Sequence, residues 1–144
     1  MLENKEMRAV LFDFLNETMK VYYKQMLEAV TLIDKFNVLS HIDYGYKTAL
    51  KIDKEYKFLN DLDLIEEILK TIIKKGKALE VNIKVQLYMT KEHLVELLNL
   101  YKSLGGTKIT LSTDSHKVEN YLKHFNYYKE IIKSCGFDYW CYYI

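Results

Sequence analysis

The chain has 144 residues and a mass of 17.2 kDa, which is the usual size of one domain, and we expect residues 1–144 to form a single domain. Hydrophobic residues make up 49% and charged residues 28% of the chain, a globular balance that excludes an extensively disordered protein. Twenty-one Lys and Arg residues balance 20 Asp and Glu residues, so the charge argues against a nucleic-acid partner.

We expect a cytoplasmic protein with no membrane contact. No apolar run approaches the roughly 18 residues that cross a bilayer, and charged residues interrupt the first ten positions, where a secretory signal would be apolar. The two cysteines, Cys135 and Cys141, are not spaced as a CxxC pair, so we expect reduced, buried thiols rather than a disulfide or a cysteine-rich zinc site.

The first third of the chain has helical periodicity. Met7, Val10 and Phe14 share one face of a predicted helix, and the apolar pattern continues through Ile33 after a break near Asn16. Asn is a favourable first cap of a helix, so the sequence predicts two helices that meet at this residue.

Three short apolar runs then predict strands, each too short for a helix. They span residues 36–42, 78–82 and 109–114. The segments between them are helical, with Asn60 and Thr90 as predicted N-caps and Gly76 and Gly105 as predicted stops. This alternation is typical of βα units and a parallel sheet.

The end of the chain repeats the pattern. A predicted helix begins at Val118 and leads through Gly136 into residues 137–143, a fourth strand candidate rich in aromatic residues. Because a complete eightfold βα barrel needs about 250 residues, this chain provides four or five units of one. The fold class is therefore α/β, as a partial (βα) barrel with about four parallel strands and surrounding helices or as a small open parallel sheet.

Polar side chains follow the predicted strands, where βα loops open onto a shared crevice. They are His41 and Asp43 after the first strand, Glu80 and Asn82 in the second, and Asp114 and His116 after the third. Residues two apart on an extended chain point the same way, so Asp114 and His116 can face one divalent metal ion. Carboxylate and imidazole ligands together favour zinc, manganese or iron over calcium.

The remaining polar residues can be interpreted as structural or solvent-exposed, and some of them also as functional. His93, in the first turn of a predicted helix, and His124 are expected to be structural or exposed. Glu80 and Asn82 either bind substrate or line a solvated strand edge. The lysine-rich and tyrosine-rich stretch 44–57 reads as a solvated helix or loop, or as a lid over an anionic substrate.

Several of these segments together resemble a known family. Ser-His-Ile-Asp at residues 40–43, Ala-Leu-Glu-Val-Asn at 78–82, and Leu-Gly-Gly at 104–106 running into Ile-Thr-Leu-Ser-Thr-Asp-Ser-His at 109–116 resemble the later motifs of the polymerase and histidinol phosphatase (PHP) superfamily. The histidinol phosphatase branch is most similar, over roughly residues 17–143. The resemblance implies a distorted barrel in which divalent metals help to hydrolyse phosphate esters, with histidinol phosphate as the substrate in histidine biosynthesis.

The resemblance also implies roles for individual residues. His41, Asp114 and His116 match metal-ligand positions, and Asp114 and His116 would be the catalytic pair. Glu80, Asn82 and Lys84 would bind a small phosphorylated substrate, with Lys84 supplying part of the charge of an arginine that the family carries after its Glu-x-Asn motif.

The family's opening His-x-His strand has no counterpart here, because no histidine precedes His41. The match therefore corresponds to the C-terminal half of the family's barrel. We expect a truncated phosphoesterase that is incomplete alone and forms a homo-oligomer or joins a complementing N-terminal half. The alternatives are a catalytically silent α/β remnant that acts as a binding or interaction module, and a small open-sheet phosphate-binding protein.

Overall fold

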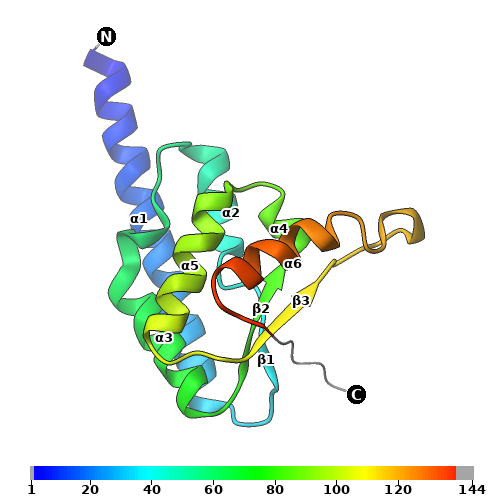
Figure 1. Ribbon diagram of the computed structural model, residues 1–144. Helices are drawn as coiled ribbons and strands as arrows, with labels where there is room; N and C mark the ends of the chain where they lie inside the picture. Colours follow the sequence, from blue (N-terminus) through cyan, green and yellow to red (C-terminus); the bar gives the residue numbers. More distant parts are fainter. Residues whose placement is uncertain (1, 139–144) are drawn as a thin grey trace.

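The structure, a computed structural model, describes residues 2–138 and has a parallel β-sheet packed against helices (Figure 1). The strands are β1 (Val38–Leu39), β2 (Ala78–Asn82) and β3 (Ile109–Ser112), in the spatial order β1-β2-β3. Both strand pairs are parallel, which confirms the mixed α/β class. The predicted fourth strand, residues 137–143, lies outside the described residues from position 139 onward, and Phe137 and Asp138 are not part of a strand.

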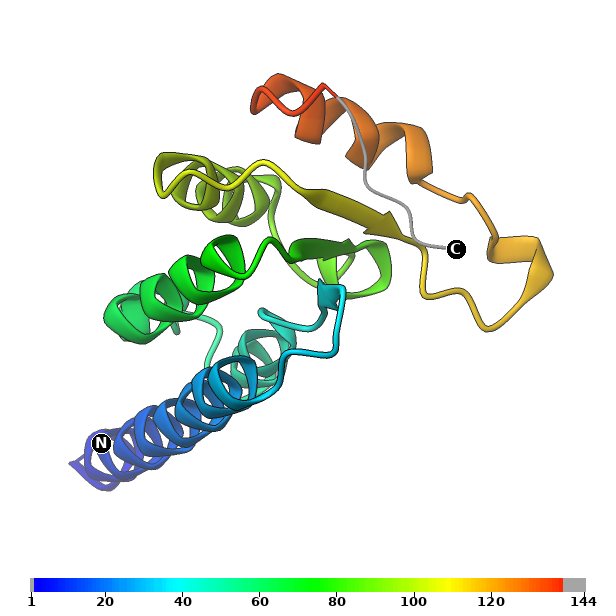
Figure 2. The ribbon, with the colours of Figure 1, turned by 90° about the horizontal axis from the view of Figure 1, so that it is seen from below.

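The helices follow one another along one side of the sheet. In Figure 2, α1, α3, α5 and α6 lie in chain order beside the strands, and neighbouring helices of this series contact each other. The α-helices are α1 (Leu2–Leu32), α2 (Tyr44–Ile52), α3 (Leu62–Lys74), α4 (Ile83–Gln86), α5 (Lys91–Ser103) and α6 (Phe125–Ser134), with short 3₁₀ turns η1 (Phe58–Asp61) and η2 (Val118–Asn120).

The alternation of side chains along β2 positions the candidate site. Leu79 and Val81 are at most 1% exposed and belong to the hydrophobic core. Each fully buried side chain of this size contributes roughly 1.5–3 kcal/mol. Successive side chains of a strand point to opposite faces, so Glu80 and Asn82 lie on the face of the sheet opposite to that of Leu79 and Val81.

The first helix differs from its prediction, because α1 runs without a break through Asn16. Leu15 and Met19 lie on either side of Asn16 and are each 3% exposed, and Tyr23 continues their row at 0%. An Asn inside a helix costs less than 1 kcal/mol, which burial of this row outweighs. The predicted break near Asn16 is therefore wrong.

Two helix starts also differ. Asn60 lies in η1, and α3 begins at Leu62 after Asp61, so the predicted cap at Asn60 is wrong. Thr90 does cap α5, since its hydroxyl oxygen accepts a hydrogen bond from His93 N at 3.2 Å. The helix predicted from Val118 begins only at Phe125, and Val118 itself is 94% exposed. A helical spacing of apolar residues alone does not show that these residues pack against the core.

Two expectations from composition can be compared with the structure. Within residues 2–138, no helix combines the length and the apolar character that crossing a membrane requires. Cys135 is a buried, free thiol at the end of α6, as predicted, whereas Cys141 lies outside the described residues.

Candidate functional site

The carboxyl ends of β2 and β3 lie side by side, because Asn82 pairs in register with Ser112. Asn82 is 3% exposed and has two partners. Its Oδ1 accepts a hydrogen bond from Val85 N at 3.1 Å, which caps α4, and its Nδ2 donates to Asp114 Oδ2 at 3.4 Å. One buried amide therefore starts the helix after β2 and orients the carboxylate after β3.

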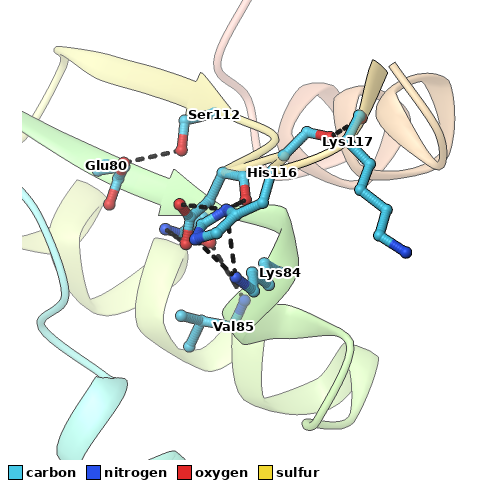
Figure 3. A network of polar contacts seen from close by, with 9 residues as sticks. Glu80, Lys84, Val85, Ser112, His116 and Lys117 are labelled. Atoms are coloured by element: carbon cyan, nitrogen blue, oxygen red, sulfur yellow. Dashed lines mark hydrogen bonds and ion pairs between the residues drawn. The ribbon is translucent and has the colours of Figure 1, made fainter. Parts of the chain in front are cut away.

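His116 extends this network into solvent. Its Nδ1 lies 3.0 Å from the carbonyl oxygen of Asp114 and 3.9 Å from Asp114 Oδ1. Lys84 Nζ lies 3.4 Å from both ring nitrogens, and Figure 3 shows this lysine reaching from α4 toward the imidazole. Since a carbonyl oxygen only accepts, Nδ1 carries the proton in this contact, and Nε2 keeps a lone pair for a cation.

Two of the three predicted metal ligands have left-handed backbone conformations. His41 has φ 66° and Asp114 has φ 46°. For residues other than glycine this conformation costs about 1–3 kcal/mol and occurs preferentially at functional sites. Each residue lies two positions after the last residue of a parallel strand, His41 after β1 and Asp114 after β3.

Glu80 lies one pleat before Asn82 on β2. Its Oε1 accepts a hydrogen bond from Ser112 Oγ at 2.8 Å (Figure 3). Its Oε2 is buried and has no hydrogen-bond partner among the residues that the structure describes. A buried carboxylate oxygen without a partner is costly, so Glu80 has a free acceptor for a substrate hydroxyl or a metal-bound group.

A cavity of about 290 Å³ opens at this end of the sheet. The charged and imidazole side chains of its lining are those of Lys84, Asp114, His116, Lys117, Lys123 and His124. Three lysines and one carboxylate, that of Asp114, belong to this lining, so the cavity attracts anions. Lys117 Nζ also lies 4.0 Å from Glu119 Oε1. Lys117 and Lys123 could not be recognised from the sequence, because their place at the cavity depends on the loop after β3.

His41 lies apart from Asp114 and His116. It follows β1, and β2 separates β1 from β3 in the sheet, which corresponds to a strand separation of about 10 Å. Its ring packs on Tyr44 with centroids 5.2 Å apart. In residues 2–138, no group of three or more His, Cys, Asp or Glu side chains lies close enough to hold a metal ion. The three-ligand arrangement is therefore not assembled here, and the ligand roles remain predictions.

The backbone at His41 is held by Tyr22, whose hydroxyl donates to the carbonyl oxygen of His41. Burial raises the pKa of Tyr22 to about 12, so the hydroxyl stays protonated and remains a donor over the physiological range. The amide of Tyr44 donates to the same oxygen at 3.1 Å. Two donors thus fix the turn that His41 occupies.

A second polar cluster lies behind His41 in the interior. Asp43 Oδ2 accepts hydrogen bonds from Gln86 Nε2 and, at 3.1 Å, from His93 Nε2, and these three residues are at most 5% exposed. His93 is therefore buried and structural rather than exposed. Sequence reasoning identified Asp43 but not its partners, because Gln86 and His93 belong to no local motif and meet Asp43 only after folding.

The donor chemistry fits a divalent transition metal. Asp114, His116 and the free oxygen of Glu80 supply carboxylate and imidazole donors of the kinds that zinc, manganese and iron accept. Lys84 contacts the same imidazole nitrogens that would bind a metal, so ligation at His116 requires its ammonium to move away. The flexible stem of lysine allows this movement.

Carboxylate and imidazole groups thus lie at the ends of parallel strands, beside a cavity lined with lysines. No protein-family model matches the chain. Named relatives are nevertheless similar to it over most of its length.

The histidinol-phosphatase of Lactococcus lactis subsp. lactis is 32% identical over 122 residues, which cover 84% of this chain and 45% of that protein. The probable histidinol-phosphatase of Clostridium acetobutylicum is 28% identical over 121 residues, or 83% of this chain and 48% of that protein. The chain therefore spans about half the length of these relatives.

A solved structure is also similar. The crystal structure of the histidinol phosphate phosphatase from Lactococcus lactis, in complex with zinc, L-histidinol and phosphate, matches with a TM-score of 0.69 and 27% identity. The match covers 88% of this chain and 48% of that one. By sequence and by structure, the chain is thus similar to histidinol phosphatases over about half of their length.

Proposed function

We propose that this chain corresponds to the C-terminal half of a metal-dependent phosphoesterase of the histidinol phosphatase type. The reaction is hydrolysis of a small phosphate monoester, histidinol phosphate in the first instance, to an alcohol and inorganic phosphate. The observation that carries the proposal is the network in which Asn82 orients Asp114, Asp114 holds His116, and Lys84 faces the imidazole at the mouth of a basic cavity.

His41, Asp114 and His116 would hold the metal, with zinc, manganese or iron as the candidates. When bound, such an ion polarises the phosphoryl oxygens and makes a water molecule a better nucleophile. The further ligands would come from a second polypeptide or from the rest of a longer enzyme. Zinc, L-histidinol and phosphate in the similar crystal structure support this choice of metal and substrate.

The chain's own side chains have separable tasks in this reaction. Lys84, Lys117 and Lys123 neutralise the phosphate as it enters the cavity, and their charge favours the transition state as negative charge shifts to the leaving oxygen. Asn82 fixes the carboxylate of Asp114, and the carbonyl of Asp114 fixes the proton of His116 on Nδ1. Water attacks phosphorus, the ester P–O bond breaks, and the departing alcohol receives a proton.

The test is phosphate release from histidinol phosphate by the purified chain, with and without added zinc or manganese. We expect activity to depend on metal and to fall at least 100-fold in Asp114→Asn, which keeps the size of the side chain but not its charge. Lys70→Ala, which removes an exposed lysine on α3, should leave the rate unchanged. No metal-dependent release from the chain, alone or with a complementing segment, would refute the enzymatic form of the proposal.

A partner is part of the proposal. The N-terminal half of α1 extends beyond the helix layer (Figure 1), and Met7, Val10, Leu11 and Phe14 on it are 47–67% exposed. Exposed apolar stripes of this kind are typical of interaction surfaces. Either a second copy or a complementing N-terminal half would cover them. Size-exclusion chromatography with light scattering tests the first, and a stable monomer at high concentration would count against it.

The second candidate is a catalytically silent module that binds a phosphorylated ligand. It is favoured by one contact, the Lys84 ammonium 3.4 Å from both nitrogens of His116, in the place a metal would take. For this function, inorganic phosphate would bind without metal, Lys84→Ala and Lys123→Ala would each weaken the binding, and no variant would alter phosphate release.

A further inference from the structure

The loop from His41 to Asp43 is held by a buried hydrogen-bond network of Asp43, Gln86 and His93, which no sequence motif predicts. Asp43 is 4% exposed, Gln86 2% and His93 5%. Gln86 ends α4, directly after β2, and His93 lies in the first turn of α5. The Asp43 carboxylate therefore ties the turn after β1 to the two elements that follow β2.

Aromatic rings fix the imidazole of His93 in this network. Tyr46 of α2 lies 4.9 Å from it and Phe58 of η1 lies 4.8 Å from it, measured between ring centroids. The Phe58 ring stands edge-on at 89°. Rings on two elements thus pack against the imidazole, whose Nε2 lies 3.1 Å from Asp43 Oδ2. A carboxylate accepts but does not donate, so Nε2 carries the proton.

The network contributes less to the stability of the core than apolar side chains would. Gln86 Oε1 and His93 Nδ1 are both buried and have no hydrogen-bond partner in the part of the chain that the structure describes. A partly satisfied buried network is less stable than apolar side chains of the same shape. Its contribution must therefore be geometric, and the element it restrains is the turn at Asp43.

That turn carries His41, whose backbone is left-handed at φ 66°. On one side, the Tyr22 hydroxyl holds the carbonyl of His41. On the other, two residues further on, Asp43 is held by His93 and Gln86. A left-handed conformation at a residue other than glycine persists only where the surrounding structure restrains it, and the direction of the imidazole follows the backbone.

We infer that His93 is a positioning residue, which acts through the buried carboxylate of Asp43 to hold the left-handed turn at His41 and so to aim that imidazole. The inference rests on the proposed function in one respect, the role of His41 as a metal ligand. Outer partners that orient metal-binding histidines typically contribute 10- to 100-fold to metal affinity.

The test uses His93→Leu and the conservative His93→Gln, which retains an N–H donor, with Leu98→Ala as the matched control. Leu98 is a fully buried residue of the same helix, so its variant lowers global stability through the core. Two readouts are compared: zinc affinity by calorimetry, and hydrogen exchange at the amides of Tyr44 and Lys47, which bond to His41 O and Asp43 O.

We expect His93→Leu to weaken zinc binding about tenfold or more and to speed exchange at both amides beyond the change in global stability. His93→Gln should restore most of both, and Leu98→Ala should alter neither after correction for stability. If wild-type protein binds no zinc, the metal site fails, and exchange alone then decides the positioning role. Wild-type exchange in His93→Leu, or unchanged zinc affinity where the wild type binds zinc, would overturn the inference.

Discussion

The turns after β1 and β3 carry the candidate ligands, and they are built in opposite ways. After β1, Asp43 lies in the interior between Gln86 and His93. After β3, 71% of the His116 side chain is exposed, and its neighbours are the Asp114 carbonyl and the ammonium of the exposed Lys84. One half of the candidate site is thus held by the core, whereas the other half can rearrange around a ligand.

Removing the carboxylate from each turn should give the largest difference in stability between the buried turn after β1 and the exposed turn after β3. Asp43→Ala leaves two buried donors without their acceptor and should lower the free energy of unfolding by about 3 kcal/mol. Asp114→Asn keeps a side chain that tolerates the left-handed backbone, so it should change the free energy of unfolding by less than about 0.5 kcal/mol. Equilibrium urea unfolding measures both. Equal losses would show that the two turns are equally integrated into the core.

Asn82 connects the two halves, so its removal should have an intermediate effect. Asn82→Ala loses the cap of α4 and the hydrogen bond to Asp114, and should cost about 1–2 kcal/mol of unfolding free energy. Asn82→Ser keeps an N-cap oxygen and should recover about half of the loss. If the serine variant were as unstable as the alanine variant, the cap would not be the source of the effect.

The elements that sequence predicted well are those set by local chemistry. β2 spans residues 78–82 in the prediction and in the structure. Its apolar run is bounded by a glycine before it and by a capping Asn at its end. Thr90 caps α5 as predicted. Asp114 and His116 also lie close together, with His116 Nδ1 3.9 Å from Asp114 Oδ1. The left-handed backbone at Asp114, however, is not the extended chain from which the sequence predicted a shared direction.

The elements that sequence missed depend on tertiary contacts. Asn16 looked like a helix start, but burial of Leu15 and Met19 carries α1 through it. His93 gave no signal of its network, because its partner Asp43 is 50 residues away. The same holds for the separation between His41 and Asp114, which depends on β2 lying between β1 and β3.

Alkaline titration should sharpen the comparison at the β1 turn. The pKa of Tyr22 is raised from 10.0 to about 12, first by burial and then by the Asp43 charge, while the Gly45 backbone acts in the opposite direction. In the unfolded chain this hydroxyl ionises near pH 10, so its contribution to stability is present below pH 10 and is lost as the pH rises through about 12.

Tyr22→Phe should therefore show a shallower loss of stability between pH 10 and 12 than the wild type. At neutral pH it should cost about 1 kcal/mol, the contribution of one hydrogen bond to the His41 carbonyl. Thermal unfolding across this pH range measures both effects. Parallel pH profiles for the two proteins would contradict the raised pKa of Tyr22.

His116→Ala should have the smallest effect on the protein without ligand, within about 0.5 kcal/mol, because the side chain is largely exposed. Its effect should emerge only with metal: zinc at about 100 times its Kd would stabilise the wild type by roughly 2.7 kcal/mol and the variant much less. Unfolding with and without zinc tests this. Equal stabilisation of both proteins would place the metal elsewhere, whereas a zinc shift confined to the wild type would mean that the exposed turn is organised by its ligand rather than by the fold.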